Sequence, residues 1–205
     1  MNRYGGFAAL ALFLAGCDDA NDEIGSLEEG QLNLTPGSLG WAHMLVLPEA
    51  RAWAEDAELA LAEGYGAGGL TTSTGGGYYT LTYLSPSGVR AGFVATVNGE
   101  EMGHPGQRLL PEWMTPACAI TDWEVDSDEL ALVATEEESG LPFAWLALMA
   151  PATVEGFVED DDSARTMLGE PLRDPPSAAP DGPVYRVPGE NGAELWYSAT
   201  TGEAL

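Results

Sequence analysis

Residues 78–97 read YYTLTYLSPSGVRAGFVATV, and this stretch has the clearest pattern of β structure in the chain. Tyr79, Leu81 and Tyr83 alternate with threonines and serve as the apolar positions; a period of two is typical of a strand that buries one face. The Ser-Pro-Ser-Gly sequence at 85–88 predicts a turn. Residues 89–97 then return as a second strand that ends at Asn98-Gly99. The stretch therefore predicts an antiparallel hairpin.

Upstream of the hairpin, the pattern predicts a helix over about 48–57. Pro48 is placed at its start, where a missing N–H is harmless. Four apolar residues fall on one face at helical spacing: Leu47, Ala50, Trp53 and Ala54. Residues 58–64 either continue this helix or form a strand, and the glycine- and threonine-rich residues 64–77 predict a loop.

Downstream of the hairpin, a loop rich in proline and glycine precedes a short predicted strand at 120–125. Ser127 is the predicted N-cap of a helix over 128–139, because its hydroxyl can accept from the exposed N–H groups of a first turn. An apolar strand is expected at 143–149. Segments 184–187 and 195–199 predict a closing hairpin, and the acidic, proline-containing residues 154–182 an insertion.

The order of elements predicts an α+β fold in which helices pack on an antiparallel β-sheet. Helix followed by hairpin occurs twice, so we expect a first half at 41–110 and a second half at 111–205. The sequence at 55–62 also echoes that at 126–133. Gene duplication and chance similarity among Ala, Leu and acidic residues both explain this echo.

The N-terminus reads MNRYGGFAALALFLAGC and predicts a signal peptide at 1–16. Its apolar core of twelve residues makes about 18 Å of helix, too short for a hydrocarbon layer of about 30 Å. Leu14-Ala15-Gly16-Cys17 resembles the bacterial lipobox, in which the cysteine thiol is acylated after cleavage. Cys17 is therefore the predicted lipidation site, and several acyl chains would anchor the protein to a membrane.

Residues 17–40 are predicted to form an acidic, flexible tether behind the lipidated cysteine. The resulting localisation is exported and lipid-anchored, on the periplasmic face or the cell surface of a bacterium. Asp18 resembles the signal that retains some lipoproteins at the inner membrane.

The charge of the chain argues against anionic partners. The sequence holds 33 acidic residues against seven Arg and no Lys, which gives a net charge of −26. Nucleic acids and anionic lipid headgroups need basic residues, so they are not expected partners. Divalent cations and basic proteins remain, beside the simpler interpretation of a solvated acidic surface.

Three segments resemble PepSY domains of bacterial envelope proteins. Residues 195–203, LWYSATTGE, are similar to the closing strand and turn of these domains. Residues 123–131, WEVDSDELA, are similar to the strand, Asp-Ser-Asp and helix that open them, and 53–59, WAEDAEL, to an element often found ahead. Ser198 stands where Asp is usual, and the segment 154–182 separates strands that are normally adjacent. The resemblance implies a non-catalytic envelope module that binds or restrains peptidases, and no catalytic residue carries over.

Residues with catalytic or metal-binding chemistry are few. His43 is expected to be packed, His104 to lie in a loop, and Cys118 to be a buried thiol. Asp160, Asp161 and Asp162 are weak calcium candidates, because they supply carboxylates without the spacing of an EF-hand. We therefore expect no catalytic residue and no cofactor.

The leading hypothesis is a non-enzymatic, membrane-anchored envelope lipoprotein that binds or restrains a protein or peptide, preferably at an exposed strand edge. The alternatives are a calcium-binding or halo-adapted acidic surface protein and a carboxylate-dependent hydrolase.

Overall fold

The computed structural model describes residues 35–65, 78–88, 90–99, 101–131, 145–159, 180–188 and 194–205. These residues belong to one compact unit, Leu32–Leu205. A separate unit, Met1–Gln31, lies outside the described residues, and with it the predicted signal peptide and Cys17.

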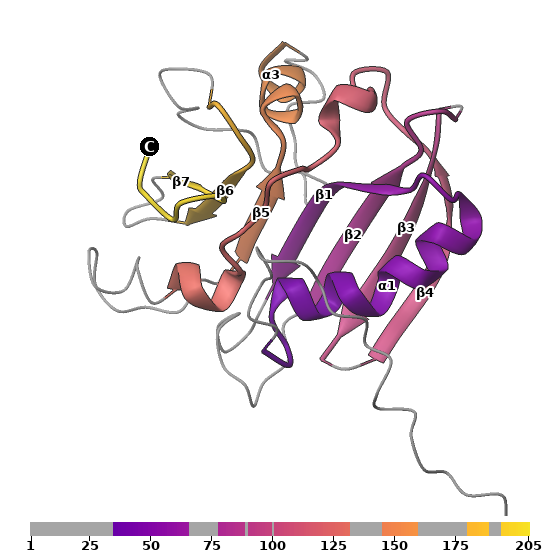
Figure 1. Ribbon diagram of the computed structural model, residues 1–205, viewed down its shortest axis with the longest axis horizontal. Helices are drawn as coiled ribbons and strands as arrows, with labels where there is room; N and C mark the ends of the chain where they lie inside the picture. The colour runs from indigo at the N-terminus through magenta and orange to yellow at the C-terminus, as the bar shows by residue number, and fades with distance from the viewer. Residues whose placement is uncertain are drawn as a thin grey trace, which may run out of the picture. The chain divides into compact units, whose positions relative to one another are not determined.

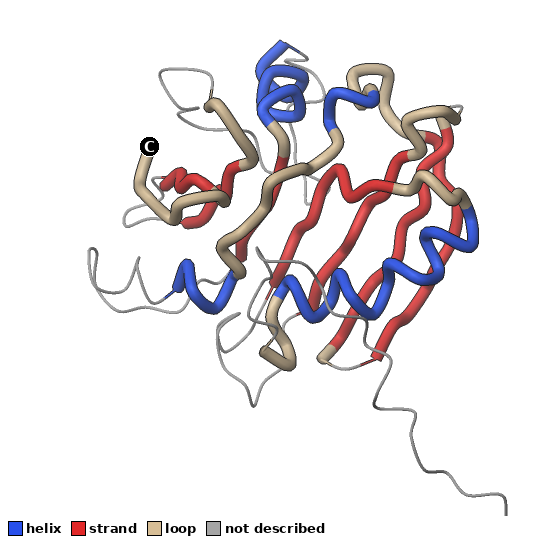
Figure 2. Tube along the Cα trace, viewed as in Figure 1, coloured by secondary structure: helices blue, strands red, loops and turns tan. Residues whose placement is uncertain are grey.

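In the described part of the chain, seven strands form one antiparallel sheet in the order β4-β3-β2-β1-β5-β6-β7 (Figure 1; Figure 2). Their bounds are β1 Glu58–Tyr65, β2 Tyr78–Leu84, β3 Ala91–Asn98, β4 Glu101–Leu109, β5 Trp145–Met149, β6 Val184–Pro188 and β7 Glu194–Ser198. The first four strands run outward from the centre in one direction and the last three in the other, with β1 and β5 paired in the middle. The predicted α+β class with an antiparallel sheet is confirmed.

The predicted hairpin is confirmed as β2 and β3. Tyr83 pairs with Phe93, and Gly88 N donates to Ser85 O at 3.0 Å to close the turn. Of the two alternatives for 58–64, the strand is right: β1 carries a bulge between Leu59 and Leu61 and is buried along most of its length.

Helix α1 spans Leu39–Trp53 and covers one face of the sheet (Figure 1). It begins earlier than predicted, because Ser38 caps it by accepting from Trp41 N at 3.1 Å. Leu39 and Gly40, assigned to the tether, are buried helix residues. Pro48 lies inside the helix on its exposed side, where water can bond the carbonyl that proline leaves without a donor.

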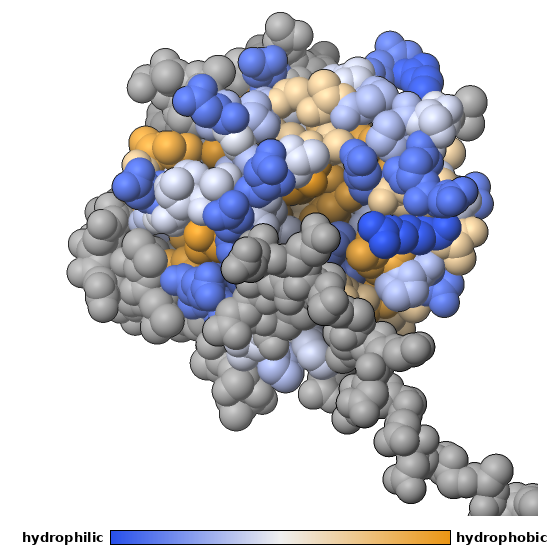
Figure 3. Space-filling model, viewed as in Figure 1, coloured by the Kyte–Doolittle hydropathy of each residue, from blue (hydrophilic) through white to orange (hydrophobic). Residues whose placement is uncertain are grey.

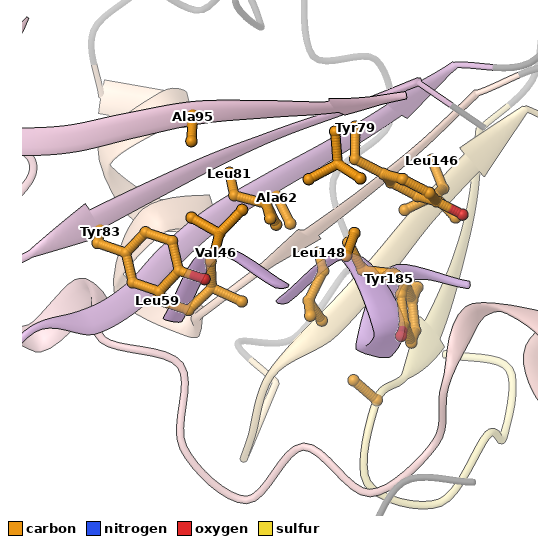
Figure 4. Close-up of a cluster of buried hydrophobic side chains, with 14 of the residues drawn as sticks. Val46, Leu59, Ala62, Tyr79, Leu81, Tyr83, Ala95, Leu146, Leu148 and Tyr185 are labelled. Carbon is orange, nitrogen blue, oxygen red and sulfur yellow. The ribbon is translucent and has the colours of Figure 1, made fainter. Parts of the chain in front are cut away.

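The larger hydrophobic core lies between α1 and the sheet. Val46 of the helix meets Leu59, Leu81 and Tyr83 of the strands (Figure 4). Figure 3, which views the α1 side, shows polar residues with apolar surface between them. The opposite face has smaller cores, formed with residues around Trp113, the 3-10 helix η1 (Pro116–Cys118) and helix α3 (Pro151–Glu159).

Two predictions for the chain after the hairpin need correction. The prediction of a Pro/Gly-rich loop after the hairpin is wrong, because these residues form the edge strand β4. Prolines and glycines are tolerated at a sheet edge, where one side of the strand makes no ladder bonds. The predicted strand at 120–125 is irregular, although Ile120 N donates to Leu59 O at 2.7 Å.

The predicted strand at 143–149 and the closing hairpin are confirmed as β5 and the β6–β7 pair. Strands β5 and β6 pair directly, with Ala147 opposite Arg186, so the long segment between them leaves the sheet continuous. Helix α3 occupies the start of this predicted insertion, and residues 160–179 lie outside the described residues.

The predicted sequence echo does not mark equivalent positions. Residues 55–62 run through a turn into β1, whereas 126–131 form the start of a helix, which the structure describes over 127–131. The remainder of the predicted helix, 132–139, lies outside the described residues.

Candidate functional site

Strand β4 forms one edge of the sheet and, among the described residues, pairs only with β3. Its register jumps from Thr96 opposite Gly103 to Val94 opposite Gly106. Two residues of β4 therefore oppose the single residue Ala95: His104, which has a positive φ of 50°, and Pro105, which has no N–H. This bulge divides the edge into two short stretches, 101–103 and 106–109.

The hydrogen bond of Leu110 shows which residues of the stretch 106–109 point their backbone N–H and C=O groups toward β3 and which point them outward. Leu110 N donates to Arg90 O at 2.8 Å, so residue 110 points its backbone groups toward β3. Alternate residues of an antiparallel strand bond to opposite sides. Gln107 and Leu109 therefore direct their N–H and C=O groups away from β3, and the Leu109 residue is 82% exposed.

The opposite edge of the sheet, β7, is covered by the residues that follow it. Ser198 N donates to Glu203 O at 2.8 Å, and Leu205 N donates to Trp196 O at 2.9 Å. Gly202 makes this return with a φ of 76°, as expected for the Thr-Gly turn. The Ser198 hydroxyl, where PepSY domains usually have Asp, accepts from Thr201 N at 3.1 Å.

A pocket of about 410 Å³ lies where β2 ends, β3 begins and β4 ends. Its lining residues are Leu84, Ser85, Gly88, Arg90, Leu110, Glu112, Met114, Thr115 and Pro116. Leu110 packs so closely on Gly92 that a Cβ there would lie 2.4 Å from its Cδ2. At the rim, the Arg90 guanidinium lies 2.8 Å from the Glu112 carboxylate, whose side chain is 88% exposed.

Asp56 holds the β2–β3 turn beside this pocket. Its carboxylate accepts from the Ser85 hydroxyl at 2.6 Å and from Ser87 N at 2.8 Å. These hydrogen bonds, that from Ser85 first, lower the pKa of Asp56 to about 2. The turn residues at the pocket are therefore held by a carboxylate that stays charged in mildly acidic solution.

A buried ionic cluster lies on the sheet face opposite α1. The Arg186 guanidinium forms an ion pair with Glu194 and lies 5.1 Å from the centre of the Trp145 ring. Glu63, 2% exposed, shares this face, because Glu63, Ala147 and Arg186 stand opposite one another across three strands. Buried charges are tolerated when paired, so we interpret the cluster as structural. The sequence reasoning missed it, because its residues come from three separated segments.

Asp126 joins the two helix N-termini. Its carboxylate accepts from Gly40 N at 2.8 Å, from the Ser38 hydroxyl at 2.6 Å and from Ser127 N at 2.6 Å. Leu39 N donates to Ser127 Oγ at 2.9 Å. The prediction that Ser127 caps its own helix is therefore wrong: Asp126 occupies that position, and Ser127 serves α1. Burial raises the pKa of Asp126, although the hydrogen bonds from Ser38 and Gly40 act to lower it.

The two histidines lie in different settings. His43 is packed as predicted: its ring stacks on Tyr83 at 5.7 Å, Nδ1 lies 2.9 Å from the Tyr83 hydroxyl, and Trp123 meets it edge-on. Burial, with a smaller effect of Arg51, lowers the pKa of His43 to about 4. His104 is exposed, as a loop residue would be, but it belongs to the β4 bulge.

Of the other predicted site residues, one is buried and the rest lie outside the residues that the structure describes. Cys118 is a buried free thiol, as predicted, and its Sγ lies 3.7 Å from Trp113 O. Cys17, Asp160, Asp161 and Asp162 lie outside the described residues. Within the described ranges, no group of three or more His, Cys, Asp or Glu is placed to hold a metal ion. No helix in the same ranges is long and apolar enough to cross a membrane.

No protein-family model matches the chain, and no curated protein matches it. A solved structure, that of a candidate lipoprotein from Clostridium difficile 630, is similar to this chain with 9% sequence identity and a TM-score of 0.46, over 78% of this chain and 87% of that one.

Proposed function

We propose that this protein is a non-enzymatic, PepSY-like envelope lipoprotein that binds or restrains a protein or peptide partner at the β4 edge of its sheet. The observation that supports this most is the contrast between an edge that pairs on one side and an edge that the chain itself covers. Unpaired N–H and C=O groups are a template for an extended peptide, which adds as a further strand.

The architecture behind this proposal is two related halves. One contains α1 with β1–β4, and the other contains the helix at 127–131 with β5–β7. The first strand after each helix lies at the centre of the sheet, where β1 and β5 pair antiparallel. This arrangement supports a PepSY-like duplication, in which Asp126 ties the start of one helix to the start of the other.

In this proposal Cys17 carries the lipid, so the folded domain works at a membrane surface outside the cytosol. Replacing Cys17 with Ala should abolish metabolic labelling with a radioactive fatty acid and release the protein from membranes. Cys118→Ala is the matched control, because a buried thiol should not be acylated. If the Cys17→Ala protein is still labelled, the anchor is misassigned.

Partner binding is tested in intact cells with a photo-crosslinking amino acid at exposed positions around the sheet. We expect crosslinks to a defined envelope protein from some of these positions and none from the same cells without irradiation. Failure to crosslink any envelope protein from any exposed position would remove the proposal's main support.

A second candidate is a calcium-binding acidic protein, which the net charge of −26 and the acidic run at Asp160–Asp162 favour. Calorimetric titration of the whole chain separates the two. A saturable calcium site at micromolar to millimolar concentration favours the second candidate. Heat that only follows ionic strength favours the first.

A further inference from the structure

We propose that the stretch 106–109 of β4 and the pocket beside it together accept a short extended peptide in which basic and large apolar residues alternate. This rests on the proposed function and names the chemistry of the partner. The strand edge supplies backbone hydrogen bonds, and the pocket supplies space for one side chain of the peptide. The negative charge of the chain favours positive charge on the peptide's other side chains.

The bulge determines the length of the segment that can bind. His104 and Pro105 interrupt the edge, so a continuous ladder extends only over 106–109. Within it, Gln107 and Leu109 present the outward N–H and C=O groups. A partner can therefore make about four backbone hydrogen bonds, each contributing about 1 kcal/mol net. Such binding is weak and reversible unless side chains add to it.

The pocket lies on the sheet face that would receive alternate side chains of that peptide. Tyr83 and Phe93 face α1, so their neighbours Leu84 and Gly92 lie on the opposite face. Arg108, opposite Gly92, lies on that second face too, as does Leu110 two residues later. Leu84 and Leu110 line the pocket, and its remaining walls include Met114 and Pro116. A long apolar side chain is the chemistry that this lining fits.

Charge selects the remaining positions of the peptide. The Glu112 carboxylate at the pocket rim is paired with Arg90 at 2.8 Å, and Arg108 lies on the strand itself, so the selection comes from the charge of the chain as a whole, which is −26. This field attracts Lys and Arg side chains and repels a second copy of the same chain. A basic, amphipathic strand is therefore a better occupant than another copy's β4.

The test uses a fluorescent, end-capped peptide of eight residues with Lys and Leu alternating, titrated into the full chain by anisotropy. The control peptide has four Lys followed by four Leu, and so has the same charge and composition. We expect the alternating peptide to bind about tenfold more tightly, a difference of about 1.4 kcal/mol. Equal binding would reduce the interaction to charge alone and overturn the proposal.

Two pairs of variants locate the binding. Gln107→Pro removes an outward N–H and should weaken binding about fivefold or more, whereas Gln107→Thr keeps that N–H and should bind within about twofold of the original chain. Thr115→Trp fills the pocket and should weaken binding about tenfold, whereas Thr121→Trp, at an exposed position outside the pocket lining, should not. Thermal melts verify that all four variants fold.

If the two Gln107 variants bind the peptide equally, the strand edge is not the binding site. If the two Trp variants bind it equally, the pocket is not. Either result overturns the proposal. A concentration-dependent dimer that Gln107→Pro dissociates would replace the peptide with a second copy. If the peptide does not bind but crosslinked partners persist in cells, this inference fails and the proposed function stands.

Discussion

The two edge strands of the sheet differ in what their outward backbone N–H and C=O groups bind. At β7, the chain turns back through Gly202, so Ser198 N and Trp196 O are bonded within the chain. At β4, the described residues show no second neighbour, and protection is limited to the bulge at His104 and Pro105. Edge strands promote aggregation unless they are covered or interrupted. An edge that is only interrupted is therefore the better candidate for a function.

The charged residues of the two edges differ in the same way. Arg186, next to the covered edge, is 1% exposed and paired with Glu194, whereas Arg108 in β4 is exposed. The arginine beside the covered edge is therefore buried, whereas the arginine of the β4 edge is in contact with water. Three experiments test this contrast directly, and a fourth perturbs a residue away from both edges.

The largest effect should come from removing the buried cation. Arg186→Met leaves Glu194 buried without its partner, and we expect the free energy of unfolding to fall by about 3–5 kcal/mol. Arg108→Met removes the same charge at the open edge and should change it by less than about 0.5 kcal/mol. Urea unfolding followed by tryptophan fluorescence measures both. Similar losses in the two variants would show that the edges do not differ in this respect.

A pH titration perturbs a residue that belongs to neither edge. Burial lowers the pKa of His43 in the folded chain to about 4, against an ordinary histidine pKa of 6.5, so the unfolded chain binds the extra proton between these values. His43 should therefore reduce stability as the pH falls from about 6.5 to about 4, by at most about 3 kcal/mol.

The His43 effect is isolated by difference, because the raised pKa of Asp126 acts in the opposite direction. The fall in stability should be smaller in His43→Gln than in the original chain, when both are measured by urea unfolding from pH 7 to pH 4. Equal slopes would show that His43 titrates normally.

Proline at an outward-facing position compares the edges directly. Ser198→Pro removes the N–H that donates to Glu203 and the hydroxyl that accepts from Thr201 N, so we expect a loss of about 2 kcal/mol. Gln107→Pro removes an N–H that points away from the sheet and should lose less than about 0.5 kcal/mol. Thermal melts rank the two. The reverse order would mean that the β4 edge is already covered.

The smallest effect is expected from adding one methyl group to a glycine at each edge. Gly202→Ala forces a side chain into a φ of 76° and should lose about 1 kcal/mol, although the added Cβ would make only an ordinary contact, 3.8 Å from Val125. Gly106→Ala meets no atom within 4 Å and should be neutral or slightly stabilising. Chemical unfolding at one pH separates them. A loss at Gly106 equal to that at Gly202 would point to a steric constraint on β4.

The sequence predicted elements where local pattern and tertiary structure agree. The alternating β2 and the turn at 85–88 are such cases, because period-two burial and turn residues act over short range. It failed at β4, whose glycines and proline resemble a loop until a neighbouring strand is known. It also failed at Pro48, which was placed at the start of a helix that Ser38 begins. Of the candidate site, it named an exposed edge in general terms but not the strand.

Residue type and near neighbours were enough to predict the α+β class, the β2–β3 and β6–β7 hairpins, the acidic charge, the packed ring of His43 and the buried thiol of Cys118. The folded structure was needed to find which edge is covered, that Arg186 pairs with Glu194 on the face that also holds Glu63, and that Asp126 binds the N-terminus of α1. These features depend on contacts between residues far apart in the chain, such as Ser38 and Asp126, which are 88 positions apart, and a local pattern carries no information about such pairings.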